Sequence, residues 1–286
     1  MAALGLASCR RASSPADGPA VVRRADRVRF VAIGDYGLEG APAADVAELV
    51  RGMSPEFIIT LGDNNYANGR ATTIDDNIGR YYHDWIAPYV GRHGAGAEDN
   101  RFFPSLGNHD WRTPDVAPYR DYFALPGREV YYELRWGPVH LVALDSDPAE
   151  PDGTAPDSVQ AAWAHHALTA SDAPWKIVYF HHPPYSSGDH GSTRRMQWPF
   201  AEWGAHVVLS GHDHVYERID VGGMPYIVNG LGGHPSRYDF GRPIVGSQVR
   251  FNDDYGAMRI DASAERLELE FVTRAGTSID RIVLGA

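Results

Sequence analysis

Short apolar runs, each ending in glycine and a polar residue, alternate with segments of helical periodicity in the first part of the chain. Residues 28–33 and 57–61 are apolar runs that predict buried β-strands, and each is followed by Gly-Asp. Between them, residues 42–53 carry apolar side chains at helical spacing and begin with a proline, which is favourable in a first helical turn. The strand–helix–strand order is typical of two neighbouring parallel strands joined by a crossover.

The pattern of short apolar runs continues to the end of the chain, and it becomes purely β-like after residue 215. One further helix is predicted at residues 157–170, and its apolar face consists of Val159, Ala162, Trp163 and Ala167. Further strands are predicted at residues 102–106, 131–134, 139–144, 175–180, 207–210, 225–229, 256–261, 267–273 and 279–284. The sequence therefore predicts an α/β fold, a two-sheet β-sandwich flanked by helices, formed as a single domain by residues 27–286.

Five of the predicted strands end in short polar segments. These are GDYG at residues 34–37, GDNNY at 62–66, GNHD at 107–110, FHHPP at 180–184 and GHDH at 211–214. The carboxyl ends of parallel strands are where α/β sheets bind their ligands, and a glycine lets backbone and ligand approach closely. We therefore expect these segments to meet in one site.

Together the five segments supply carboxylates, a phenol, an amide oxygen and imidazoles. This donor set suits hard and borderline metal ions, and a thiolate site is excluded because Cys9 is the single cysteine. Each segment alone is more often an ordinary loop, and GHDH alone is compatible with a surface turn that carries two solvated histidines. All five in order, each after an apolar run, favour a metal site.

The charge of the chain restricts its partners. A formal net charge of −11 at pH 7 argues against nucleic acid and against an anionic membrane surface as binding partners. An anionic substrate therefore requires something other than a basic patch to attract it. No sequence signal indicates an oligomeric state.

Residues 1–26 differ in composition from the rest of the chain. Residues 6–9 (LASC) fit the cleavage pattern of a bacterial lipoprotein signal, with Cys9 as the lipidated residue, and residues 10–20 predict a disordered tether. No basic residue precedes this motif, whereas an export signal needs a basic start and an apolar run of about 7–15 residues. We interpret the segment either as a truncated export signal or as a chance match. The first interpretation predicts a periplasmic or cell-surface protein with a lipid tether, and the second leaves the cytoplasm open.

The five polar segments resemble the motifs of the calcineurin-like metallophosphoesterases, and among them those of the purple acid phosphatases of the tartrate-resistant type. That family carries GDxG, GDxxY, GNH, VxxH and GHxH, and all five occur here in order between Gly34 and His214. The resemblance covers roughly residues 27–231. It implies the αββα metallophosphoesterase fold and the hydrolysis of phosphate esters at a centre of two metal ions.

The resemblance also implies a role for each motif residue. The first metal would take Asp35, Asp63, Tyr66 and His214, and the second would take Asp63, Asn108, His181 and His212, so that Asp63 bridges the two. The phenolate of Tyr66 is a hard anionic donor that favours Fe(III) and would give a charge-transfer colour. Fe(II), Zn or Mn would suit the second site.

A dimetal centre of this kind implies that one metal activates a water molecule while the other orients the phosphoryl group. The resemblance places His109 and His190 near the leaving-group oxygen, as general acids or phosphate-binding donors. The alternative for His190 is a solvated loop histidine, and His182 is interpreted as a packing residue or a neighbour of the metal ligands. His234, in a glycine-rich turn after a predicted strand, is the other histidine that we expect near the site.

Three functions fit these observations. A phosphomonoesterase is preferred, and a phosphodiesterase or nucleotide pyrophosphatase with the same dimetal centre is the alternative. A non-catalytic metal-binding module at the cell surface belongs to a different class. Such a module has no use for His109 and His190 as proton donors, so these residues favour the enzyme.

Overall fold

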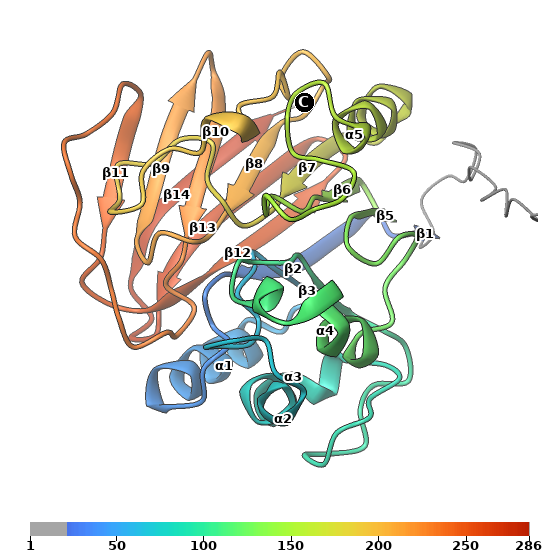
Figure 1. Ribbon diagram of the computed structural model, residues 1–286. Helices are drawn as coiled ribbons and strands as arrows, with labels where there is room; N and C mark the ends of the chain where they lie inside the picture. Colours follow the sequence, from blue (N-terminus) through green and yellow to red (C-terminus); the bar gives the residue numbers. More distant parts are fainter. Residues whose placement is uncertain (1–21, 286) are drawn as a thin grey trace, which may run out of the picture.

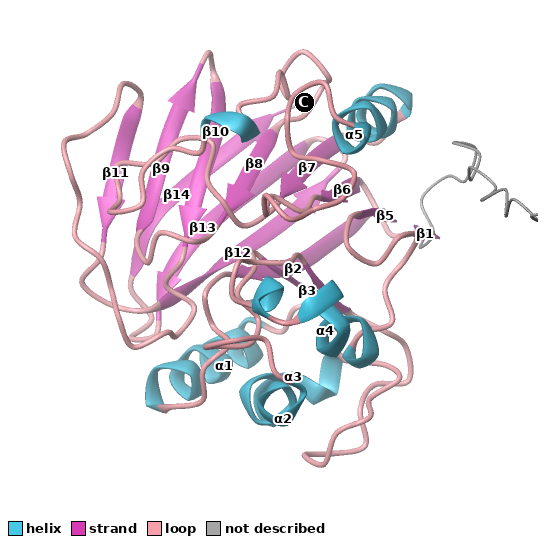
Figure 2. Cartoon of the chain, viewed as in Figure 1, coloured by secondary structure: helices cyan, strands magenta, loops and turns pink. Residues whose placement is uncertain are grey.

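Two β-sheets pack face to face, and helices cover their outer faces (Figures 1 and 2). The computed structural model describes residues 22–285. In spatial order, the eight-stranded sheet consists of β1 (Val22–Arg23), β5 (Tyr132–Trp136), β6 (Val139–Ala143), β7 (Trp175–Tyr179), β8 (Val207–Ser210), β10 (Met224–Asn229), β9 (Tyr216–Val221) and β11 (Ser247–Phe251). The six-stranded sheet consists of β14 (Ser278–Gly285), β13 (Arg266–Thr273), β12 (Gly256–Ser263), β2 (Arg27–Ile33), β3 (Phe57–Thr60) and β4 (Phe102–Pro104).

Each sheet contains a block of parallel strands. In the six-stranded sheet β2, β3 and β4 run parallel, and in the eight-stranded sheet β6, β7, β8 and β10 run parallel. The five polar segments follow β2, β3, β4, β7 and β8, each starting within three residues of the strand's end. The candidate site residues therefore extend from the carboxyl ends of parallel strands, as predicted, and these strands belong to both sheets.

The largest apolar cluster fills the space between the two sheets. Phe30, Phe57 and Trp136 belong to it, and the Phe30 and Phe57 rings stack with their centroids 4.6 Å apart. A second cluster lies between the six-stranded sheet and the helices on its outer face, which are α1 (Ala41–Met53), α2 (Ala71–Ile74), α3 (Arg80–Tyr82) and α4 (Ala117–Tyr122). A third cluster packs α5 (Val159–Ala170) against the eight-stranded sheet. The predicted α/β fold with two sheets flanked by helices is confirmed.

The helix α5 forms as predicted, and its predicted apolar face is confirmed in part, since Ala167 is buried and Trp163 packs against the core. Val159 is 57% exposed and Ala162 is also exposed, whereas Gln160 is fully buried. The Gln160 side chain accepts a hydrogen bond from the backbone N–H of Asp145 and donates to the Asp145 and Gly153 carbonyls. A polar residue whose hydrogen bonds are all satisfied can be buried, so polarity alone misassigned part of this face.

Several elements differ from the prediction at the periphery. Strand β1 lies within residues 1–26, the segment interpreted as signal and tether, where it pairs with β5. Strands β9 and β11, which pair at one edge of the eight-stranded sheet, were not among the predicted strands. Cys9 lies outside the described residues, so the lipid anchor stays a prediction. Within residues 22–285 no helix combines the length and apolar character needed to cross a membrane.

Candidate metal centre

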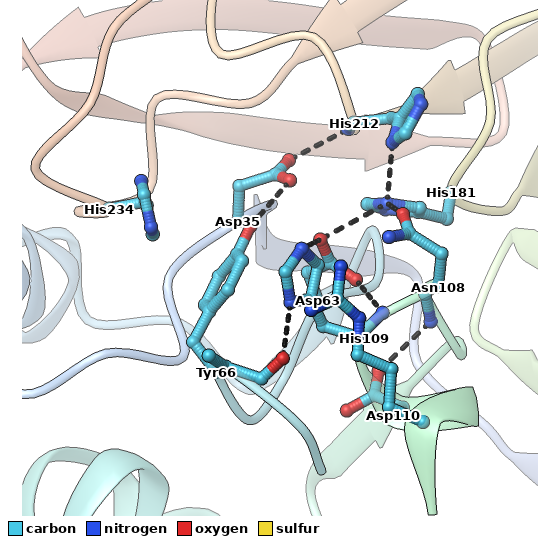
Figure 3. A network of polar contacts seen from close by, with 12 residues as sticks. Asp35, Asp63, Tyr66, Asn108, His109, Asp110, His181, His212 and His234 are labelled. Atoms are coloured by element: carbon cyan, nitrogen blue, oxygen red, sulfur yellow. Dashed lines mark hydrogen bonds and ion pairs between the residues drawn. The ribbon is translucent and has the colours of Figure 1, made fainter.

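The strand ends of both sheets meet at one place, and all seven predicted metal ligands lie there, as Figure 3 shows for all of them except His214, which contacts Asp35 and Tyr66. The six-stranded sheet contributes Asp35 after β2, Asp63 and Tyr66 after β3, and Asn108 after β4. The eight-stranded sheet contributes His181 after β7, with His212 and His214 after β8. The donor atoms of Asp35, Asp63 and His181 all lie within 4.8 Å of one another, and all three residues are buried.

One group of donors is formed by Asp35, Tyr66 and His214. Tyr66 Oη lies 3.0 Å from Asp35 Oδ1 and 3.2 Å from His214 Nε2, and these last two atoms are 3.3 Å apart. Donors that bind one metal at about 2.0–2.2 Å lie about 3 Å apart when their bonds are nearly perpendicular. The Nδ1–H of His214 donates to the Ser236 carbonyl at 2.6 Å, which leaves the Nε2 lone pair facing the other donors. The three atoms therefore fit one metal ion.

A second group of donors is centred on His181. Its Nε2 lies 3.1 Å from Asn108 Oδ1, 3.1 Å from His212 Nδ1 and 3.4 Å from Asp63 Oδ2. Its Nδ1–H donates to the Leu61 carbonyl at 2.8 Å, so Nε2 is the ring nitrogen that faces the other donors. These separations again match neighbouring donors around a single metal, and Asp63 lies between the two groups.

The backbone at three of these residues has an unusual conformation. Asp35, Asp63 and His212 have φ angles of 55°, 52° and 71°, in the left-handed region that residues other than glycine rarely occupy. The conformation lets Asp35 Oδ2 accept a hydrogen bond from the His212 backbone N–H at 2.8 Å, which links the two sheets across the site. Conformations of this kind cost about 1–3 kcal/mol each and cluster at functional sites.

The electrostatics of the site favour a cation. Burial raises the pKa of Tyr66 well above its ordinary value, and the charges of Asp35 and Asp63 raise it further. Burial alone lowers the pKa of His181, but Asp63 raises it, and the result is a pKa of about 10. In the chain by itself, a protonated imidazole thus compensates the buried carboxylates, and Tyr66 keeps its proton. A bound metal ion would take over that compensation and would stabilise the phenolate.

The two predicted proton donors flank the donor groups. His109 lies with its ring centroid 4.4 Å from that of Tyr66, and its Nε2 is 3.9 Å from Asp63 Oδ2. Its Nδ1–H donates to the Ala67 carbonyl at 2.7 Å, so Nε2 is the atom free to bind and release a proton. His190 is exposed and stacks on His212 with a centroid distance of 4.2 Å.

Two buried carboxylates hold the loop that carries His190. Asp213 accepts hydrogen bonds from the Ser186 hydroxyl at 2.5 Å and from the His190 backbone N–H at 2.8 Å. Glu217 accepts from both the backbone N–H and the hydroxyl of Ser187, each at 2.6 Å. Both acids are fully buried. Because several donors from one loop converge on them, they fix where His190 lies relative to His212.

Asp110 supports the site from the six-stranded sheet. Its Oδ2 accepts hydrogen bonds from the backbone N–H of Gly107 and from both the backbone and the side-chain N–H of Asn64. Burial and the neighbouring charge of Asp63 raise its pKa to about 7. Asp110, Asp213 and Glu217 were not identified from the sequence. The feature of the sequence that could have pointed to them is their position, inside a metal motif for Asp110 and Asp213 and three residues after one for Glu217.

The other histidines follow the expectation in part. His234 lies near the site, as expected of its glycine-rich turn, with its ring centroid 4.4 Å from that of Tyr66 and 4.6 Å from that of His214. In Figure 3 His234 and His109 lie on opposite sides of Tyr66. Away from the site, His140 is buried and pairs with Glu133 at 2.7 Å, which is a structural role.

Known proteins resemble this chain in sequence and in fold. A family model described as calcineurin-like phosphoesterase matches residues 28–216. The chain is 25% identical over 298 residues to tartrate-resistant acid phosphatase type 5 of Mus musculus, with 88% of each chain covered. It is 26% identical over 249 residues to purple acid phosphatase 17 of Arabidopsis thaliana, covering 74% of this chain and 70% of the plant protein.

Two solved structures share the fold. The purple acid phosphatase PPD1 from yellow lupin (Lupinus luteus) seeds has a TM-score of 0.74 at 18% identity and covers 94% of this chain and 55% of the lupin chain. GAP50, described as the anchor in the inner membrane complex of Plasmodium, has a TM-score of 0.71 at 17% identity, covering 91% and 89% of the two chains. Since the family model covers well over half of the sequence and the strand ends of both sheets form the expected site, the chain belongs to the calcineurin-like phosphoesterase family and is a metal-dependent phosphoester hydrolase.

Proposed function

We propose that the protein is a phosphomonoesterase of the purple acid phosphatase type. One observation carries the proposal: two adjacent groups of donor atoms, with Asp63 near both, have the separations expected of neighbouring metal ligands. The first metal would be held by Asp35, Asp63, Tyr66 and His214. The second would be held by Asp63, Asn108, His181 and His212.

The donor chemistry supports a different metal at each position. Tyr66, Asp35 and Asp63 make the first site rich in anionic oxygen, which favours Fe(III). The second site combines one carboxylate with an amide oxygen and two imidazoles, a set that accepts Fe(II), Zn or Mn. When bound, such a pair of metals supplies a nucleophile at moderate pH and neutralises charge on the phosphoryl group.

The residues of the chain then bind and orient the substrate and move the protons. Leaving-group departure requires a proton donor, and the Nε2 of His109 is free for that role because Nδ1 is held by the Ala67 carbonyl. His190 is presented to solvent beside His212 by a loop that Asp213 and Glu217 hold in place. His109 and His190 thus flank the proposed metal positions from different loops, which suits one substrate held between them.

The substrate class is tested with purified protein reconstituted with iron and zinc. Metal content, the visible spectrum and hydrolysis of p-nitrophenyl phosphate and bis(p-nitrophenyl) phosphate are measured on the same sample. We expect two metals per chain, a visible band and a clear preference for the monoester. Preference for the diester would replace the proposal by the phosphodiesterase alternative. Two bound metals with no turnover of either ester, or of a nucleoside triphosphate, would favour the non-catalytic module.

A further inference from the structure

The three imidazoles proposed to bind metal are not held in the same way. His181 and His214 each donate their Nδ1–H to a backbone carbonyl, at 2.8 Å and 2.6 Å. Imidazole ligands are usually oriented by a hydrogen bond of this kind. His212 instead directs Nδ1 towards His181 Nε2, and its Nε2 has no hydrogen-bond partner among residues 22–285. The ring of His212 therefore lacks the usual anchor.

Packing against two further imidazoles replaces the missing hydrogen bond. The His190 ring stacks on His212 with a centroid distance of 4.2 Å and an interplanar angle of 22°, and the His182 ring lies at 4.5 Å and 51°. His190 is exposed, whereas His182 is only 8% exposed. His182 is thus the better-fixed support.

His182 is itself locked in place by Ser146, which follows β6. The Ser146 hydroxyl oxygen accepts a hydrogen bond from the His182 backbone N–H at 2.9 Å and lies 2.9 Å from His182 Nδ1. Ser146 is fully buried, and no other acceptor for its proton occurs among the described residues. The hydroxyl must therefore donate to Nδ1, which fixes both the ring orientation and the tautomer, with the proton on Nε2.

Ser146 is held in turn by the neighbouring segment. Its backbone carbonyl accepts a hydrogen bond from Arg195 at 2.8 Å. On the other side of the pair, Pro183 and Pro184 follow His182 and restrict the backbone directly after it. Ser146 on one side and the two prolines on the other thus hold the His182 ring in position, and neither contact requires a metal.

We propose that His182 is a positioning residue that keeps His212 directed at the second metal, and that Ser146 sets the position of His182. The inference rests on the proposed dimetal site, although not on its substrate. According to this inference, Ser146 and His182 contribute to the affinity for the second metal by orienting His212, although neither binds the metal itself. Loss of residues that orient a metal ligand typically costs about 10–100-fold in metal affinity.

The test compares Zn²⁺ affinity in four variants of the full-length, iron-loaded protein, by competition with a chelator and without substrate. His182→Ala is expected to weaken Zn²⁺ binding by about 10–100-fold. Ser146→Ala is expected to weaken it by a smaller factor, because the His182 imidazole is still present in that variant. His182→Phe, which keeps a ring against His212, is expected to recover most of the loss. His165→Ala is the matched control, since His165 is an exposed histidine that packs on Trp203 away from the site.

The visible band of the iron site serves as an internal reference and should stay unchanged in all four variants. Zn²⁺ affinity of His182→Ala equal to that of the His165→Ala control would overturn the proposal, as would a Phe variant as weak as the Ala variant. If His182→Ala fails to fold, Ser146→Ala decides, and an affinity equal to the control overturns the idea. Absence of phosphoester turnover in the wild type would contradict the proposed function but not this inference.

Discussion

Adding one methyl group at Gly62 should disrupt the second metal position, because the methyl group would clash with the His181 side chain. Gly62 has a φ of 88°, and a Cβ there would lie 2.5 Å from Nδ1 of His181 and 2.6 Å from its Cβ and Cγ. His181 has no room to yield, because it is fully buried and its Nδ1–H is bound to the Leu61 carbonyl at 2.8 Å. Gly62→Ala therefore has to move the imidazole or the strand end that carries it.

The expected cost has two parts that a control variant separates. A left-handed backbone costs an L-residue about 1–2 kcal/mol, and overpacking a rigid site costs about 1–3 kcal/mol, which together give about 2–5 kcal/mol. Gly223 has a nearly identical φ of 89°, but a Cβ there would meet nothing within 4 Å. Gly223→Ala should therefore show the backbone cost alone, about 1–2 kcal/mol.

The assay is urea unfolding of both variants with the metals chelated, followed by metal analysis of the reconstituted proteins. We expect Gly62→Ala to be the less stable of the two by about 1–3 kcal/mol, and to retain the first metal while losing the second. Equal stability of the two variants, combined with two metals in Gly62→Ala, would show that His181 is not rigidly confined. The reasoning from packing would then be wrong.

Three other changes test separate parts of the site and the fold. Tyr66→Phe removes the phenolate and should abolish the visible band of the iron-loaded protein and weaken Fe(III) binding, so an unchanged spectrum would rule out the phenolate assignment. His109→Ala should lower kcat for p-nitrophenyl phosphate by about 10²–10⁴-fold at unchanged metal content, and retained turnover would exclude His109 as the proton donor. Burial raises the pKa of Asp145 and of Glu150 above their ordinary values. The folded state therefore holds these protons more tightly than the unfolded state, so their stabilising contribution is present at low pH and is lost as the pH rises from about 4 through the raised values. Glu150→Gln removes one such proton and keeps the acceptor for Asp152, so the urea midpoint should fall less between pH 5 and pH 8 than in the wild type, and an identical fall would contradict the assignment.

The positions of the proposed metal ligands were predictable because each follows a buried parallel strand. Such strands are short apolar runs, and the polar residue after the last apolar position has to lie at the carboxyl edge of the sheet. Asp35 and His181 could be placed on this basis alone, although they belong to different sheets. The apolar pattern does not predict how the two sheets pack against each other, because that packing depends on the side chains of the core between them.

The supporting residues were not predictable for a related reason. Asp213 lies between two histidines of one motif and Glu217 lies in β9, so neither stands out in the sequence from an exposed polar residue. They are buried because serine and backbone donors from residues 186–190 converge on them, a contact between distant segments. Gln160 misled the prediction of the α5 face in the same way. The short helical turns between residues 71 and 85 are too brief to show a periodicity.

Each proposed metal position takes its donors from both halves of the sandwich: Asp35 and Tyr66 extend from the six-stranded sheet, and His214 extends from the eight-stranded sheet. A bound metal is therefore a removable cross-link between the sheets. At a free metal concentration of one hundred times Kd, each site would add about 2.7 kcal/mol to the free energy of unfolding. Metal supply would then govern the lifetime of the protein as well as its chemistry. Chains without metal would lack activity at once, and they would also open more readily between the two sheets and be cleaved by proteases.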